Sequence, residues 1–300
     1  MEILVSGASG LIGAAVCKDL AAHGHHIAKL VRRENTGSDE VRWTPGEPLL
    51  PKSVARFDAV LHFAGKNIAC RWSEKAKREI RESRLLGTVT LSEAVAAAHR
   101  ESGRPHTFVS TSAIGYYGSR GDEELRENST AGYGFLAELT KEWEAATTAA
   151  WEAGVRVVLP RLALVLSAAG GALPKMLPAF RLGLGGRIGS GRQYWSWISL
   201  EDVIGGVEFL LQQENLSGAF NFSAPQPVTN AEFTKTLAAV LHRPAIFPMP
   251  AGAARLAMGP SADELLLSSQ RVLPERLLAA GYQFRDVSLR EALATLLKSG

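Results

Sequence analysis

Short apolar runs alternate with longer amphipathic stretches through the first half of the chain. Such runs are typical of strands buried on both faces, and apolar residues at helical spacing are typical of helices that cover a sheet. The expected strands are Glu2–Val5, Ile27–Val31, Ala59–Phe63, Thr107–Ser110 and Val155–Leu159. The expected helices are Leu11–His23, Glu74–His99 and Phe135–Ala153. This order predicts an α/β fold with a Rossmann-type, doubly wound parallel sheet.

The pattern changes after about residue 166. Glycine-rich segments, which are typical of loops, appear at 168–171, 183–186 and 189–191. A helix over Leu200–Gln212 and a strand over Ala219–Ser223 then resume the α/β order. We therefore expect a dinucleotide-binding Rossmann domain over residues 1–166, continued by about 196–223. Residues 167–195 and 224–300 are expected to form a smaller, interleaved substrate lobe.

Composition narrows the classes of protein. A chain of 300 residues, 46% of them hydrophobic, can bury a large core. The 33 basic and 30 acidic residues give a net charge of +3 with no basic block, which argues against a nucleic-acid partner. Cys17 and Cys70 have no metal-ligand spacing, no apolar span of about 18 residues is present, and no signal peptide is evident. We expect a cytoplasmic protein with no metal and no membrane partner; its oligomeric state stays open.

A glycine-rich turn follows the first expected strand and opens the first expected helix. It runs Gly7-Ala8-Ser9-Gly10-Leu11-Ile12-Gly13. In this context Gly7 permits a tight turn, Gly10 allows close backbone approach to a pyrophosphate, and Gly13 allows close packing of helix on strand. The helix N-terminus adds free N–H groups for the phosphates. The alternative is an ordinary glycine-rich surface turn.

The end of the second strand predicts which dinucleotide is bound. NAD-binding chains usually carry an acidic residue there for the ribose 2′-hydroxyl, but this chain has Val31-Arg32-Arg33. A guanidinium can bind a 2′-phosphate with paired hydrogen bonds, which favours NADP, with Arg32 the stronger candidate. The alternative is a solvated strand end.

Later segments resemble the extended short-chain dehydrogenase/reductase superfamily, of the nucleoside-diphosphate-sugar epimerase-like type. His62-Phe63-Ala64-Gly65 is similar to its cofactor-lining segment, and Val109-Ser110-Thr111-Ser112 followed by Tyr116-Tyr117-Gly118 is similar to the run that carries a catalytic Ser or Thr. Further stretches resemble an atypical branch, the sugar nucleotide epimerase-like "epimerase family protein": 66–68, 71–72, 80–84, 170–175, 189–193 and 269–274. The resemblance covers nearly the whole chain. It implies that Phe63, Ala64, Gly65, Ser110, Leu162 and Ala163 contact the cofactor.

One departure from the superfamily concerns the proton-transferring Tyr, which stands four residues before a Lys. Here Lys141 is the Lys candidate and Ala137 stands in the place of the Tyr. The resemblance implies that Ser112 takes the catalytic Ser position and that Lys141 holds ribose hydroxyls; the alternative for Lys141 is a solvated helical lysine. Tyr116 or Tyr117 could replace the missing phenol, or could pack the loop.

These observations favour an NADP-dependent oxidoreductase or epimerase-like enzyme. Its substrate would be a small molecule of nucleotide- or sugar-linked type. The altered Tyr position keeps open a second class, an NADPH-binding sensor or regulatory protein that does not turn the cofactor over. An RNA-associated member of the superfamily is a third class, which the unclustered basic residues do not favour.

Overall fold

A parallel sheet forms the centre of the molecule in the computed structural model, which describes residues 1–34 and 37–298. Seven strands follow one another in the order β12-β8-β5-β4-β1-β2-β3, and β6 also pairs with β8. Their bounds are β1 Glu2–Ser6, β2 His26–Val31, β3 Glu40–Arg42, β4 Ala59–His62, β5 Thr107–Ser110, β6 Ser112–Ala113, β8 Arg156–Leu162 and β12 Gly218–Phe222. All these pairings are parallel, so the predicted fold class is confirmed.

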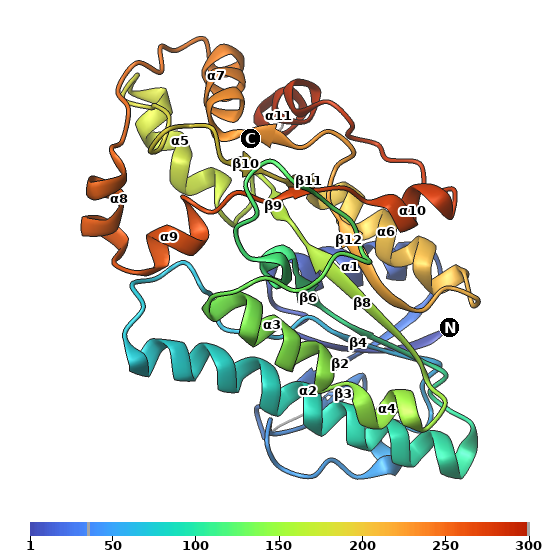
Figure 1. Ribbon diagram of the computed structural model, residues 1–300. Helices are drawn as coiled ribbons and strands as arrows, with labels where there is room; N and C mark the ends of the chain where they lie inside the picture. Colours follow the sequence, from blue (N-terminus) through green and yellow to red (C-terminus); the bar gives the residue numbers. More distant parts are fainter. Residues whose placement is uncertain (35–36, 299–300) are drawn as a thin grey trace.

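Helices cover both faces of this sheet (Figure 1). Alternate residues of β1 divide between two hydrophobic cores, as the two-residue period of a strand requires. Ile3 and Val5 pack with α1 (Leu11–Ala22) and α6 (Leu200–Gln212). Leu4 lies in the other core, against the helices α2 (Glu74–Ser102) and α4 (Thr148–Glu152). The sheet is therefore doubly wound.

A smaller assembly of helices and short strand pairs lies beyond the carboxyl ends of the strands (Figure 1). It has its own hydrophobic core, which includes Leu177, Trp197, Phe233 and Leu293. Its helices are α5 Leu173–Arg181, α7 Asn230–Leu241, α8 Ala251–Met258, α9 Ser261–Leu265 and α11 Leu289–Lys298. Its strand pairs are β9 (Leu164–Leu166) with β11 (Trp197–Ser199), and β10 (Tyr194–Trp195) with β13 (Val228–Thr229). The pair β7 (Glu124–Leu125) with β14 (Arg271–Val272) and the helix α10 (Glu275–Ala279) pack instead in the core of the sheet that contains Ile3 and Val5. The domain boundaries given above stay a prediction.

The structure divides one helix that the sequence predicts as continuous. The expected Phe135–Ala153 helix is α3 (Phe135–Ala145) followed by α4. At the break, the hydroxyls of Thr147 and Thr148 donate to the carbonyls of Glu144 and Ala145. Such local bonds compete with helical ones, and β-branched residues favour helix less than others do. Two 3₁₀ turns complete the elements, η1 Pro51–Ser53 and η2 Ile114–Tyr117. Among the described residues, no helix is long and apolar enough to cross a membrane.

Candidate functional site

The backbone of the glycine turn lies so close to its neighbours that side chains at Gly7 and Gly13 would clash with them. Gly7 has φ of +71°, and a Cβ there would lie 2.7 Å from the backbone of Phe63 and Ala64. A Cβ on Gly13 would lie 2.3 Å from the Gly7 carbonyl oxygen. Gly10 is the N-cap of α1 and supplies no side-chain cap, so the first N–H groups of the helix stay available to an anion. The turn therefore fits a pyrophosphate.

A groove of about 1100 Å³ opens on one side of this turn. Gly7, Ser9, Arg32, Ala64 and Gly65 line it, and all five were predicted to bind the cofactor. The Arg32 side chain is exposed and makes no hydrogen bond or ion pair with any residue that the structure describes.

The second arginine of the strand end is engaged. Arg33 forms an ion pair with Glu40, and backbone and side-chain hydrogen bonds from Gly37 and Arg33 lower the pKa of Glu40. Of the two arginines, Arg32 is therefore the one whose guanidinium is available to bind a ligand in the groove.

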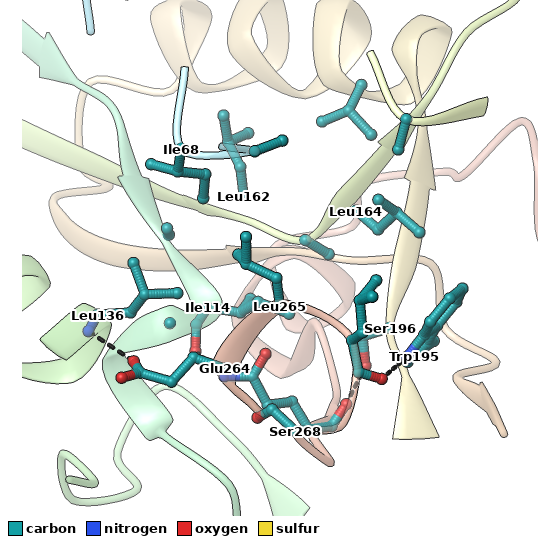
Figure 2. Close-up of a pocket in the computed structure, with 18 of the residues that line it drawn as sticks. Ile68, Ile114, Leu136, Leu162, Leu164, Trp195, Ser196, Glu264, Leu265 and Ser268 are labelled. Atoms are coloured by element: carbon teal, nitrogen blue, oxygen red, sulfur yellow. Dashed lines mark hydrogen bonds between the residues drawn. The ribbon is translucent and has the colours of Figure 1, made fainter. Parts of the chain in front are cut away.

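A cavity of about 400 Å³ opens on the other side of the turn, at the carboxyl ends of β6 and β8. Figure 2 shows Ile68, Ile114, Leu162 and Leu265 around it. Three predicted cofactor contacts, Leu11, Leu162 and Ala163, line its wall. The small lobe contributes the opposite wall with Met176, Trp195, Met258, Leu265 and Leu266. Because Ser9 lines the groove and Leu11 lines the cavity, the turn lies between the two spaces.

Three predicted contacts lie behind these surfaces rather than on them. Ile12 and Phe63 pack against the hydrophobic core and line neither space. Ser110 is fully buried, and its hydroxyl has no hydrogen-bond partner among the described residues.

His62, at the end of β4, is also fully buried. Its Nδ1 hydrogen-bonds with the Ser6 hydroxyl, and burial lowers its pKa to about 3. The imidazole is therefore neutral at physiological pH.

Ser112 and Tyr117 belong to one buried polar network. The Ser112 hydroxyl donates to Glu144 Oε1 at 2.6 Å, and Arg161 donates to both oxygens of that carboxylate at 2.8 Å. Tyr117 donates to Asn221 Oδ1 at 2.7 Å and accepts from Arg161 at 2.9 Å. Burial raises the pKa of Tyr117 to about 12. The Tyr117 hydroxyl thus has hydrogen-bond partners for both its donor and its acceptor inside the protein. This argues against the prediction that it replaces the missing Tyr as proton donor.

Tyr116 lies beside this network. Its ring covers the Arg161 guanidinium at 3.6 Å and meets the Tyr117 ring edge to face. Neither Ser112 nor Tyr116 lines the groove or the cavity, whereas the neighbouring Ala113 lines the cavity. The loop-packing alternative given for the two tyrosines describes this geometry.

The helical face that meets the cavity differs by one residue from the predicted register. Leu136 and Thr140 of α3 line the cavity, one turn apart. Ala137 is fully buried elsewhere, and Lys141 is exposed, lines neither space, and has no hydrogen bond or ion pair with a described residue. Leu136 and Thr140 therefore face the cavity with the same four-residue spacing as the Tyr and Lys of the motif, and the role given to Lys141 stays a prediction. The structure does not bring Lys141 to the site.

Most of the cavity wall was not among the predicted site residues, and three charged or aromatic members of it stand out. Arg84 reaches it from α2, and Tyr194 reaches it from β10. Glu264 of α9 accepts hydrogen bonds from the backbone N–H groups of Phe135 and Leu136 at 3.0 and 2.8 Å, so the small lobe caps α3 (Figure 2). Arg84 falls in a stretch that the resemblance singled out, but nothing in its spacing pointed to a cavity.

Comparison with protein families agrees with this geometry. The model of the NAD dependent epimerase/dehydratase family matches residues 3–222. The chain belongs to this family. A domain of unknown function, DUF1731, matches residues 249–296, which span α8 to most of α11.

Individual relatives place the chain in the atypical branch. Epimerase family protein Mb2239 of Mycobacterium bovis is 46% identical over 294 residues, which are 97% of this chain and 96% of that protein. Human epimerase family protein SDR39U1 is 35% identical, covering 99% of this chain and all of that protein. The predicted atypical short-chain dehydrogenase/reductase relationship is confirmed.

Solved structures show the same fold. The crystal structure of human epimerase family protein SDR39U1 (isoform2) with NADPH matches with a TM-score of 0.89 and 34% identity, over 100% of both chains. The Thermus thermophilus UDP-glucose 4-epimerase complex with NAD has a TM-score of 0.73 at 20% identity, covering 99% of this chain and 98% of that one. The second likeness concerns the fold alone.

Proposed function

We propose that the chain is an NADP-binding oxidoreductase whose dinucleotide spans the groove and the cavity. The observation that carries the proposal is the glycine turn, which separates the two spaces and offers them the free end of α1. The adenosine half lies in the groove, with the pyrophosphate at Gly7–Gly10. The nicotinamide half faces Leu162 and Ala163. The NADPH in the human relative's structure supports the same cofactor here.

Arg32 supports NADP over NAD. It lines the groove at the end of β2, no carboxylate of the described residues pairs with it, and it follows the strand whose end meets the adenosine ribose in this fold. A 2′-phosphate would satisfy its guanidinium with charge-assisted hydrogen bonds.

The cavity favours a small, apolar carbonyl compound over a nucleotide sugar. Most of its wall is Leu, Ile, Val, Met and Trp, and its cationic group is Arg84 alone among the described lining residues. A diphosphate would meet little opposite charge there. Bound NADPH would supply hydride. The chain's own apolar wall would exclude water from the carbonyl. The hydroxyls of Tyr194 and Ser268 line this wall, donate to none of the described residues, and can hydrogen-bond the carbonyl oxygen, whereas the Thr140 hydroxyl already donates to the Leu136 carbonyl at 2.6 Å.

The residues of the cavity wall support epimerisation less well than carbonyl reduction. Epimerisation by proton removal needs a base, yet Glu264, the carboxylate of the described lining residues, already accepts two backbone hydrogen bonds. A Lys and a Tyr are absent from the α3 positions that face the cavity. A non-catalytic NADPH-binding role is the second candidate, and the same missing groups favour it.

Cofactor choice is tested by titrating the protein with NADPH and with NADH while following tryptophan fluorescence. We expect NADPH to bind more tightly, and Arg32→Ala to weaken NADPH binding by about 10- to 100-fold, since hydrogen bonds to charged groups contribute about 1.5–3 kcal/mol. NADH binding should change little. Arg33→Ala is the matched control, because Arg33 already pairs with Glu40. Equal binding of both dinucleotides by the unchanged protein would overturn the NADP assignment.

Turnover separates the enzyme from the sensor. The NADPH-loaded protein is mixed with a panel of apolar aldehydes and ketones, and loss of absorbance at the reduced nicotinamide is followed. Oxidation of NADPH with matching alcohol formation supports the oxidoreductase. Tight NADPH binding without oxidation across the panel favours the regulatory candidate.

A further inference from the structure

Arg84 occupies the junction between the groove and the cavity. Its side chain lines the cavity, while the preceding Ser83 lines the groove. A Cβ built on Gly65, which follows β4 and lines the groove, would lie 3.4 Å from the Arg84 guanidinium carbon. The guanidinium therefore lies beside the strand end where one space passes into the other.

Only one of the three guanidinium nitrogens of Arg84 donates hydrogen bonds to the described residues. Nη1 donates to the carbonyl oxygens of Lys66 at 3.0 Å and Ile80 at 3.2 Å. Nε and Nη2 donate to none of the residues that the structure describes. Trp143 presents its ring to the guanidinium at 5.1 Å. One nitrogen and one aromatic face thus fix the orientation of the group, and two donors remain for a ligand.

No carboxylate among the described residues compensates this charge. Burial lowers the pKa of Arg84 to about 10, so the group stays protonated at neutral pH. By contrast, the buried guanidinium of Arg161 is paired with Glu144 through two hydrogen bonds. Arg84 is half-buried, and a cation removed from water in part without a counter-charge is costly, so such groups commonly serve a ligand rather than stability.

We propose that Arg84 binds the nicotinamide ribose of the dinucleotide, with Nε and Nη2 donating to its hydroxyls. This inference rests on the proposed function, since it requires a dinucleotide that passes from the groove into the cavity. Thr140 lines the cavity at the spacing of the motif's lysine, and a hydroxyl cannot supply that charge. Arg84 supplies it from α2 instead.

Two ligands separate this role from a general effect on the groove. NADPH contains the nicotinamide ribose, whereas adenosine 2′,5′-bisphosphate contains only the adenosine half. Both are titrated against the full chain, Arg84→Met, Arg84→Lys, and the control Arg81→Met. Arg81 lies almost one turn earlier on α2, and its partner is Glu142 on the protein surface.

We expect Arg84→Met to weaken NADPH binding about tenfold or more, and to leave adenosine 2′,5′-bisphosphate binding within about twofold. Arg84→Lys should retain part of the NADPH affinity, because an ammonium keeps the charge without the fork. Arg81→Met should match the unchanged protein with both ligands. The ligand-free Arg84→Met protein should unfold at a temperature no lower than the unchanged protein, since an uncompensated charge is removed.

Three results would overturn the assignment. Unchanged NADPH binding by Arg84→Met would exclude the ribose contact while leaving the proposed function standing. Equal weakening of both ligands, or a lower unfolding temperature of ligand-free Arg84→Met together with full NADPH affinity in Arg84→Lys, would indicate a purely structural guanidinium. Failure of the unchanged protein to bind either ligand would instead remove the proposed function, and this inference with it.

Discussion

Replacing Glu144 by Gln tests whether the Ser112–Glu144–Arg161–Tyr117 network is structural. The Arg161 and Glu144 side chains are only 5% and 13% exposed, and two hydrogen bonds of 2.8 Å join them. Gln keeps the shape but removes the charge, and its amide N–H₂ opposes one Arg161 donor. The guanidinium is then buried without a counter-charge.

Breaking one partner of a buried ion pair costs about 3–5 kcal/mol, whereas an exposed pair contributes about 1 kcal/mol or less. Glu142→Gln is the matched control, because Glu142 lies on the same helix and pairs with Arg81 at side-chain exposures of 37% and 44%. We therefore expect Glu144→Gln to lower the free energy of unfolding by at least about 3 kcal/mol, and Glu142→Gln by less than about 1 kcal/mol.

Urea unfolding of the ligand-free proteins, followed by tryptophan fluorescence, measures both values. A double variant, Glu144→Leu with Arg161→Met, should be less destabilised than Glu144→Gln, because neither charge then remains buried. If Glu144→Gln were no more destabilised than Glu142→Gln, the network would not be a stabilising element. Ser112 and Tyr117 would then need another explanation for their burial.

Two further predictions concern the turn and the strand end beside it. Gly13→Ala places a Cβ against the Gly7 carbonyl oxygen, so it should lower the free energy of unfolding by about 1–3 kcal/mol and weaken NADPH binding more than tenfold. Gly252→Ala is the control, because open space surrounds Gly252, and it should have neither effect. Thermal unfolding and NADPH titration measure the two effects. Burial lowers the pKa of His62 to about 3. Below pH 6.5 the imidazole is therefore protonated in the unfolded chain but stays neutral in the folded chain. Stability from the neutral imidazole is therefore present above pH 6.5 and lost as the pH falls towards 3. Between pH 7 and 5 the unchanged protein should lose about 2 kcal/mol more unfolding free energy than His62→Asn, and equal losses would refute the assignment.

The sheet and the glycine turn follow from sequence because their causes are local. Apolar runs of strand length and the spacing of Gly7, Gly10 and Gly13 each reflect one element and its immediate neighbour. The three-residue strand β3 was missed because it is too short to carry a pattern. The break between α3 and α4 was missed because two threonine hydroxyls decide it.

The cavity could not be predicted in the same way. Its wall joins α2, α3 and the small lobe, and a motif spacing alone does not fix which face of α3 meets it. The motif spacing singled out Ala137 and Lys141, whereas the residues of α3 that line the cavity are Leu136 and Thr140, one position earlier. Arg84 was missed for a different reason: an arginine's lack of a partner is a property of the folded surroundings, not of the sequence around it.

The two spaces draw on very different lengths of the chain. The residues that line the groove all lie between Gly7 and Leu86, whereas the cavity wall also includes Met258 and Leu265. The groove is therefore built within the first part of the sheet domain, and the far wall of the cavity depends on segments that lie more than 170 residues later in the chain. A change in α8 or α9 can thus reshape the cavity while every residue of the groove stays the same.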